Sequence, residues 1–322
     1  MKKRLCLLLV LVLAFTLCLA GCGDNGGNEV KSADLDFATG GTGGTYYAYG
    51  VVLSEYVSNN CDNITITGLP GNGSQANVED VDANEVQMAF CQSDVMSYAY
   101  DGTNLFDKKV DSFSVLAALY MEQVQIVTCN PEIKTVGDLK GKIVSVGAQG
   151  SGTYFNAVDC LSAYGLTMND ITPKYLDFAS STEELKDNKI DAAFVVAGAP
   201  TNSITELSTS KKAYLVSIDA AHADKLIASN PYYSKNTIAK SAYGLDSDTE
   251  TVAVAAMVLV RDDLSEDTVY KITKTIFEGK ADIQHAKAED LDVKFASSVT
   301  AVPFHKGAAK FYTEKGITVK TK

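Results

Sequence analysis

Arginine is almost missing from this sequence. Only Arg4 and Arg261 occur among its 322 residues, and Arg4 falls in a leader segment described below. Arginine is the side chain that grips a carboxylate or phosphate through two parallel hydrogen bonds. Unless Arg261 provides such a grip, we expect a bound anion to be held by backbone amides, hydroxyl groups or a lysine.

The usual catalytic and metal-binding motifs are also missing. The sequence has three histidines but no His-Glu-x-x-His, no Gly-x-Ser-x-Gly, no Gly-Lys-Ser/Thr and no Cys-x-x-Cys. The cysteines that follow the leader, apart from Cys22, are Cys61, Cys91, Cys129 and Cys160, and we expect free, mostly buried thiols. We therefore predict a protein that is not an enzyme and has no catalytic residues, metal site or cofactor.

Positive charge is scarce as well. The chain has 40 acidic and 28 basic residues, for a net charge of −12. Residues 1–21 carry Lys2, Lys3 and Arg4 and then an apolar run, which is typical of a signal peptide. Removing them takes away three positive charges and no acidic residue, so the net charge falls from −12 to −15. This balance disfavours nucleic acid as a partner.

The leader ends in Leu19-Ala-Gly-Cys22. This ending resembles the lipobox of bacterial lipoproteins, and the resemblance implies lipidation of Cys22 and cleavage before it. Ordinary cleavage beside an incidental cysteine is the alternative. We expect residues 22–33 to form a lipid-anchored tether and the protein to be extracytoplasmic, held on the bacterial cell membrane.

The most informative stretch runs from Thr39 to Thr45, where four glycines and three threonines follow a short predicted strand. Apolar residues then recur with helical spacing from Tyr49 to Val57, so a helix should begin in the loop. The first amides of a helix lack partners and lie at the positive end of its dipole, which suits a carboxylate. The candidate ligand-binding residues of this loop are Thr42, Gly43, Gly44, Thr45 and Tyr46.

A second copy of this pattern lies further along the chain. Gly152-Thr-Tyr-Phe155 resembles Gly44-Thr-Tyr-Tyr47, and it too follows glycines and opens a predicted helix. Ser151, Gly152 and Thr153 are its candidate ligand residues. The repeat predicts two α/β lobes around an interlobe cleft, with residues 34–123 and 256–322 in lobe 1 and residues 124–255 in lobe 2.

Further candidate ligand-binding residues lie in or next to the loops that follow other predicted strands. The loops at the carboxyl ends of strands gather at one edge of an open α/β sheet, where ligands bind. These candidates are Ser74, Gln92, Ser93, Gly198 and Pro200.

Several local expectations can be stated. We expect residues 113–129 to form two strands that meet near Glu122, and residues 251–260 to pair with residues 125–129. Asn72 or Ser74 should cap a helix over 75–82, and Pro200 should occupy an early position of the next helix. We expect helices over 267–285 and 307–315, and loops in much of 219–249.

Taken together, these segments resemble the TAXI family of TRAP-transporter solute receptors. The matching segments are Thr39–Tyr47, Phe90–Asp94, Gly150–Thr153, Val260–Leu264, Val269–Phe277 and Pro303–Ala308. The resemblance implies a fold of the periplasmic-binding-protein type II kind. It also implies capture of a small organic acid or amino acid, such as glutamate or a related dicarboxylate, for delivery to TRAP membrane permease subunits.

Two other functions remain open from the sequence. One is a substrate-binding lipoprotein of an ATP-driven (ABC) importer, which shares this architecture. The other is a lipid-anchored enzyme or sensor that acts on a small organic acid.

Overall fold

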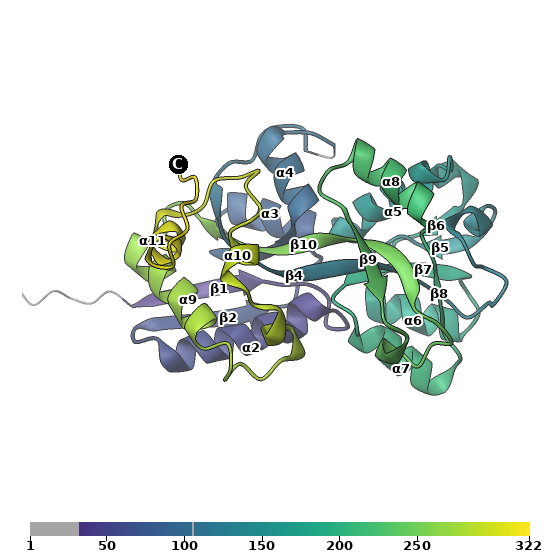
Figure 1. Ribbon diagram of the computed structural model, residues 1–322, viewed down its shortest axis with the longest axis horizontal. Coiled ribbons are helices and arrows are strands. Elements are labelled where there is room, and N and C mark those ends of the chain that lie inside the picture. Colours follow the sequence, from purple (N-terminus) through teal and green to yellow (C-terminus); the bar gives the residue numbers. More distant parts are fainter. Residues whose placement is uncertain (1–31, 105) are drawn as a thin grey trace, which may run out of the picture. The chain divides into compact units, whose positions relative to one another are not determined.

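The computed structural model describes residues 32–104 and 106–322 (Figure 1). The predicted signal peptide, Cys22 and residues 23–31 of the predicted tether lie outside the described residues. Residues 33–322 form one compact unit. Among the described residues, no helix combines the length and apolar character needed to cross a membrane.

The strands of this unit belong to one mixed sheet in the order β2-β1-β3-β10-β4-β7-β5-β6, with β8 added to β4 and β9 added to β10. Their bounds are β1 Ala33–Ala38, β2 Ile64–Leu69, β3 Met88–Gln92, β4 Phe113–Thr128, β5 Ile143–Ser145, β6 Thr172–Lys174, β7 Ala192–Ala197, β8 Tyr214–Val216, β9 Ser234–Ile238 and β10 Thr249–Arg261. The predicted strand before the glycine loop is confirmed as β1.

Strand β4 is continuous, so the prediction of two strands over residues 113–129 is wrong. Its first part pairs with β10 up to Gln123, and its last part pairs with β7 from Gln123 onward. The predicted crossing near Glu122 is therefore a change of partner rather than a break. The strand can stay unbroken because nearly all of it is buried, and a strand covered on both faces reads as one apolar run.

Strand β10 does not pair with residues 125–129, contrary to expectation. It runs antiparallel to the first part of β4, from Ala253 opposite Gln123 to Arg261 opposite Phe113. The later part of β4 is unavailable to it, because β7 pairs with residues 123–128 and β8 pairs with residues 126–128.

Buried apolar side chains form separate clusters along these two long strands. The first core comprises β1 to β3, the start of β4 and the end of β10. The second core consists of two clusters that receive alternate side chains of β7, as expected for a strand between two helical layers. Along β4, the side chains up to Tyr120 are buried in the first core and those from Val124 onward in the second. Along β10, the side chains up to Val254 are buried in the second core and those from Ala255 onward in the first. In Figure 1, β4 and β10 extend from the part of the molecule that contains β1 and β2 to the part that contains β7 and β8.

The helices lie on both sides of this sheet. Their bounds are α2 Thr45–Asn60, α3 Ser74–Asp82, α4 Ser93–Asp101, α5 Gly152–Ala163, α6 Phe178–Lys186, α7 Asn202–Ser210, α8 Ala220–Ser229, α9 Glu266–Glu278, α10 Val293–Ala296 and α11 Lys306–Glu314. Short 3-10 turns occupy Val136–Leu139, Met168–Asp170, Lys240–Ala242 and Ala286–Asp290. Both helices predicted to open in a glycine-rich loop are present, as α2 and α5.

Three helix predictions need correction. Neither Asn72 nor Ser74 caps α3, because the cap position is Gly73 and no side chain bonds to the first amides. Pro200 precedes the cap residue Thr201 and so lies outside α7. The helix predicted over 267–285 stops at Glu278, with Gly279 in the cap position.

The segment 219–249 has more regular structure than expected, since it contains α8 and β9. Asp219 caps α8 by accepting hydrogen bonds from the amides of Ala221 and His222. Its position before Ala220-Ala221 is a helix-start signal that was present in the sequence.

Candidate functional site

The glycine loop after β1 leads directly into α2, whose cap residue is Gly44. No side chain of the described residues caps the first turn and no acidic residue lies in it, so its amides are free to face a ligand. A Cβ at Gly44 would come within 3.2 Å of Phe178 Cδ2, and a Cβ at Gly43 within 3.3 Å of the amide nitrogen of Ala179. The loop needs glycine here because the start of α6 lies against it.

The second loop has the same construction. Helix α5 begins at Gly152 after the cap residue Ser151, again with no side-chain cap and no acid in the first turn. A Cβ at Gly152 would come within 2.1 Å of Gln92 Oε1 and within 2.8 Å of Ser74 Oγ. The start of α5 thus fits closely against the end of β3 and the start of α3, which both pack in the first core.

Both loops line one cavity of about 350 Å³. Helices α2, α3, α5 and α6 begin at its wall. The lining residues are Gly40, Gly41, Thr42, Gly44, Thr45, Tyr46, Pro70, Gly71, Asn72, Gly73, Ser74, Gln92, Glu122, Ala148, Ser151, Gly152, Thr153, Asp177, Phe178, Ala179, Ser180, Val196 and Ala197. The two amide-rich helix starts inferred from the sequence therefore face a common space.

Most of the predicted site residues belong to this lining. They are Thr42, Gly44, Thr45, Tyr46, Ser74, Gln92, Ser151, Gly152 and Thr153. Gly43, Ser93, Gly198 and Pro200 are not part of it. The Ser93 hydroxyl instead accepts a 3.2 Å hydrogen bond from the amide of Ala255, which joins the start of α4 to β10.

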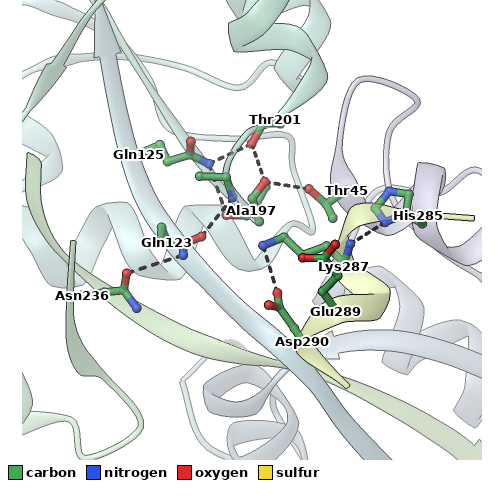
Figure 2. A network of polar contacts seen from close by, with 12 residues as sticks. Thr45, Gln123, Gln125, Ala197, Thr201, Asn236, His285, Lys287, Glu289 and Asp290 are labelled. Carbon is green, nitrogen blue, oxygen red and sulfur yellow. Dashed lines mark hydrogen bonds and ion pairs between the residues drawn. The ribbon is translucent and has the colours of Figure 1, made fainter. Parts of the chain in front are cut away.

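Gly198 contributes its carbonyl oxygen to a network of polar contacts that includes Thr45, Gln125 and Thr201, which are labelled in Figure 2. That oxygen accepts hydrogen bonds of 3.0 Å from the hydroxyls of Thr45 and Thr201. Gln125 Nε2 in turn donates to Thr201 Oγ1 over 2.8 Å. Through Thr45, the start of α2 is tied to the loop that follows β7.

Further hydrogen bonds join the first core to the second around the cavity. The amides of Gln75 and Ala76, at the start of α3, each donate to the carbonyl oxygen of Gly150 over 3.1 Å. The amide of Ser203 donates to the carbonyl oxygen of Gly43 over 3.3 Å. The structure therefore holds the two cores in contact on several sides of the cavity.

Glu122 is a cavity residue that the sequence analysis did not select as a ligand contact. It lies where β4 passes between the cores, is 2 % exposed, and accepts a 2.8 Å hydrogen bond from the hydroxyl of Tyr46. Burial raises the pKa of Glu122 to about 8, although hydrogen bonds to its carboxyl group act in the opposite direction. From the sequence, Glu122 is only the position near which two predicted strands meet, whereas the tertiary structure shows that it lines the cavity.

The start of α6 was also missed. Asp177 caps this helix by accepting a 2.8 Å hydrogen bond from the amide of Ser180, and both residues line the cavity. An Asp immediately before the first residue of a helix is a favoured N-cap, so Asp177 before Phe178 is a helix-start signal that could have been recognised.

The charge of the cavity wall is unusual for an anion site. The described lining residues include two acids, Glu122 and Asp177, and no lysine, arginine or histidine. Arg261 is bonded elsewhere, since its Nε donates to Asp263 Oδ1 over 3.0 Å. Backbone amides and hydroxyls, with Gln92, are therefore the donors available to an anion. Gln92 Oε1 and Ser151 Oγ are buried without a hydrogen-bond partner among the described residues.

Comparison with known proteins gives both a family and a fold. The model of the NMT1-like family matches residues 37–316. Two solved structures are similar over most of their length, and at 15% identity or less they inform on the fold alone.

One is the alkanesulfonate-binding protein SsuA from Xanthomonas axonopodis pv. citri bound to MOPS, at 15% identity and a TM-score of 0.53, covering 88% of this chain and 84% of that one. The other is PhnD1 from Prochlorococcus marinus in complex with methylphosphonate, at 12% identity and a TM-score of 0.51, covering 80% of this chain and 87% of that one. The predicted α/β fold of the periplasmic-binding-protein type II kind is confirmed. The prediction of a solute-binding protein family is supported, whereas the narrower TAXI assignment stays a prediction.

Proposed function

Because this chain belongs to the NMT1-like family, we propose that it is the extracytoplasmic solute-binding receptor of a transporter and does not catalyse a reaction. The observation that carries the proposal is the convergence of the uncapped starts of α2 and α5 on one cavity. A small ligand with an oxyanion group would receive hydrogen bonds from both helix starts at once.

We propose residues 34–123 with 256–322 and residues 124–255 as two lobes that move relative to one another. In residues 32–104 and 106–322, the chain passes between the two cores within β4 and within β10, so both of these passages are single extended strands. Two such connections side by side form a hinge, and the loops at Gly44 and Gly152 lie on opposite sides of the closing gap. Ligand then favours the closed form because only that form offers both sets of amides.

The cavity wall narrows the class of ligand. A carboxylate can accept hydrogen bonds from the helix starts, but the wall supplies no cationic side chain among its described residues to balance a second negative charge. Glu122 offers instead a buried oxygen that could accept a hydrogen bond from an ammonium group. We therefore propose an amino acid such as glutamate, whose own ammonium group offsets one of its two carboxylates, ahead of a related dicarboxylate, which has no such group.

A panel of ligands tests this proposal by thermal unfolding. L-glutamate, L-glutamine, glutarate, 2-oxoglutarate, ethanesulfonate and methylphosphonate cover the amine, the second carboxylate and the alternative oxyanions. At one hundred times its dissociation constant a ligand stabilises the folded protein by about 2.7 kcal/mol. That corresponds to a rise in Tm of several degrees, at about 2 to 4 °C per kcal/mol. Conversion of any hit into product would contradict the proposal and favour an enzyme.

The finer assignment concerns the partner. The resemblance to the TAXI family leads us to propose TRAP permease subunits, with anchoring to the cell membrane through lipid on Cys22. An ATP-driven importer is the second candidate, since the fold is shared with the alkanesulfonate-binding protein described above. Uptake of labelled ligand by cells that express the receptor with its neighbouring permease separates the two. Collapse of the ion gradient should stop uptake by a TRAP system. Depletion of ATP with the ion gradient maintained should stop uptake by an ATP-driven importer.

A further inference from the structure

A second group of buried polar side chains lies at the contact between the two cores, outside the cavity. Asp94, in the first turn of α4, is fully buried, and its Oδ2 accepts a 3.0 Å hydrogen bond from Asn156 Nδ2 of α5. Asn156 Nδ2 also donates to the hydroxyl of Tyr233 over 2.7 Å, and that hydroxyl donates to Asp159 Oδ2 over 3.0 Å. The chain of contacts thus joins two carboxyl groups, one from each side.

Neighbouring contacts place this group at the contact between the cores. Asn230 donates to Asp159 Oδ2 over 3.2 Å and also to the hydroxyl of Tyr98 on α4. The ring of Tyr98 packs on Phe155 of α5, with ring centroids 5.8 Å apart. Phe155 is buried with the first core although it belongs to a helix of the second.

No cation neutralises either carboxyl group within the part of the chain that the structure describes, as neither takes part in an ion pair. The titratable groups that influence Asp94 or its partners from the surrounding elements are Asp159 and Cys160 on α5, Tyr232 and Tyr233 before β9, Tyr98 on α4, Cys91 on β3 and Glu122 on β4. Each of these side chains is neutral with its proton bound and negative without it, so none of them supplies a positive charge. A negative charge on Asp94 is therefore costly while the cores are in contact.

Two oxygens in this group are buried and have no hydrogen-bond partner in the described part of the chain, namely Asp94 Oδ1 and Asn156 Oδ1. Both are acceptors when Asp94 is ionised. A proton on Asp94 turns its carboxyl group into a donor, and the carbonyl oxygen of Asn156 is the unpartnered acceptor on the side chain to which Asp94 is already bonded. One proton would therefore improve the hydrogen bonding of both residues.

We propose that Asp94, Asn156, Tyr233 and Asp159 form a proton-linked latch, which holds the two cores together with a proton on Asp94 and releases that proton to water when the cores separate. The inference depends on the opening motion that the proposed function requires, but not on the identity of the ligand. The latch also adjoins the cavity in sequence, since Gln92 lies two residues before Asp94 and Thr153 three residues before Asn156, and both line the cavity. Low pH would then favour the closed form.

The size of the effect follows from linkage. Burial raises the pKa of Asp94 from 3.8 to about 7 in the structure described, with Asp159 adding to the shift, whereas backbone amides at the start of α4 oppose it. If exposure restores an ordinary value, the closed form loses roughly tenfold of its advantage between pH 6 and pH 8.

Hydrogen exchange measures this opening without any ligand. The amides of Gln75 and Ala76 bond across the interface to Gly150, so they exchange when the cores separate. The experiment uses the Glu122→Gln protein, because Glu122 is a second buried carboxyl group with a raised pKa. After correction for intrinsic rates, protection of these two amides should fall roughly tenfold from pH 6 to pH 8, while amides within β1 provide an internal reference.

Two further variants in the same background decide the question. Adding Asp94→Asn should reduce the fall to less than about twofold, because the amide is uncharged at both pH values. Adding Asp80→Asn, on α3, removes an acid that has a raised pKa but makes no contact in this group, and it should leave the tenfold fall intact.

Protection that is independent of pH in the Glu122→Gln protein, or a full tenfold fall with Asp94→Asn, overturns the latch. If Asp94→Asn does not fold, the pH series on the Glu122→Gln protein still decides. Failure of every ligand in the thermal panel would count against the proposed function and leave this result standing.

Discussion

Gly152 lies so close to Gln92 that a Cβ on the glycine would come within 2.1 Å of the side-chain oxygen Oε1. Gly152 begins helix α5 of the second core and Gln92 ends strand β3 of the first core, and both residues line the cavity. This close approach shows that the start of α5 packs tightly against the first core.

We predict that Gly152→Ala weakens ligand binding by at least about tenfold while the protein stays folded. The added methyl group collides across the interface rather than inside either core, so it should disfavour the closed form more than the fold. Calorimetric titration with the best ligand of the panel measures the loss. Gly137→Ala is the matched control, because a Cβ there has only ordinary contacts, and it should bind normally. Equal affinity of the two variants would show that closure does not need this fit.

We predict that Gly44→Val abolishes binding and leaves the fold largely intact. A Cβ at Gly44 would approach Phe178 at 3.2 Å, so a valine side chain would keep α6 away from the glycine loop. Gly44→Ala should give an intermediate affinity because its side chain is smaller. Circular dichroism and titration of both variants provide the measurement, and unchanged affinity in the valine variant would contradict the assignment of this loop to the ligand.

We predict that Tyr46→Phe destabilises the protein by about 1 to 3 kcal/mol, since it removes the donor to a buried carboxyl group. The loss should be larger at pH 8.5 than at pH 5, because the bond lost stabilises the ionised form of Glu122. Urea unfolding at the two pH values gives the comparison. Tyr47→Phe alters the next, more exposed residue and serves as the control; a similar loss in both variants would argue against a role for the bond.

We predict that the free energy of unfolding decreases as pH rises from about 5 to about 8. Burial raises the pKa of Glu122 in the folded protein to about 8 from an ordinary 4.5, so the folded state holds a proton that the unfolded state has released. The contribution of this proton to the free energy of unfolding is complete at pH values below the pKa of Glu122 in the unfolded state. It is lost as the pH rises through the pKa of Glu122 in the folded state.

Glu122→Gln should reduce this dependence to the part that Asp94 contributes, and it should raise Tm at pH 8 relative to the unaltered protein. Thermal unfolding at pH 5, 6.5 and 8 provides the measurement. Glu55→Gln replaces an exposed glutamate of α2 and should leave the slope unchanged. A slope as steep after Glu122→Gln as before it would assign the pH dependence to other groups, because Asp94, whose pKa burial raises to about 7, should account for only part of it.

The sequence was sufficient for features set by local pattern. Glycines followed by helical spacing from Tyr49 to Val57 predicted the loop and α2, and the second copy at Gly152 predicted α5. Both follow from the absence of Cβ atoms and from the 3.6-residue period, which act within a few residues. The repeat of the motif also indicated that two helix starts share one gap.

Only the tertiary structure could decide which distant residues meet. The sequence reads the same along Phe113–Thr128 whether it is one strand or two, because burial on both faces removes any alternation that would mark a break. The partners of β4 change at Gln123 because β8 and β7 occupy its later part, a competition between strands far apart in the chain.

For the same reason Glu122 became a cavity residue and Asp94 an interface residue only once the cores were placed together. Burial, not the residue type, sets the pKa of each carboxyl group, and burial depends on every element packed around it. The sequence by itself therefore determined the helix starts that could receive an anion. The packing of the two cores decided which acids lie beside them and at what pH those acids hold a proton.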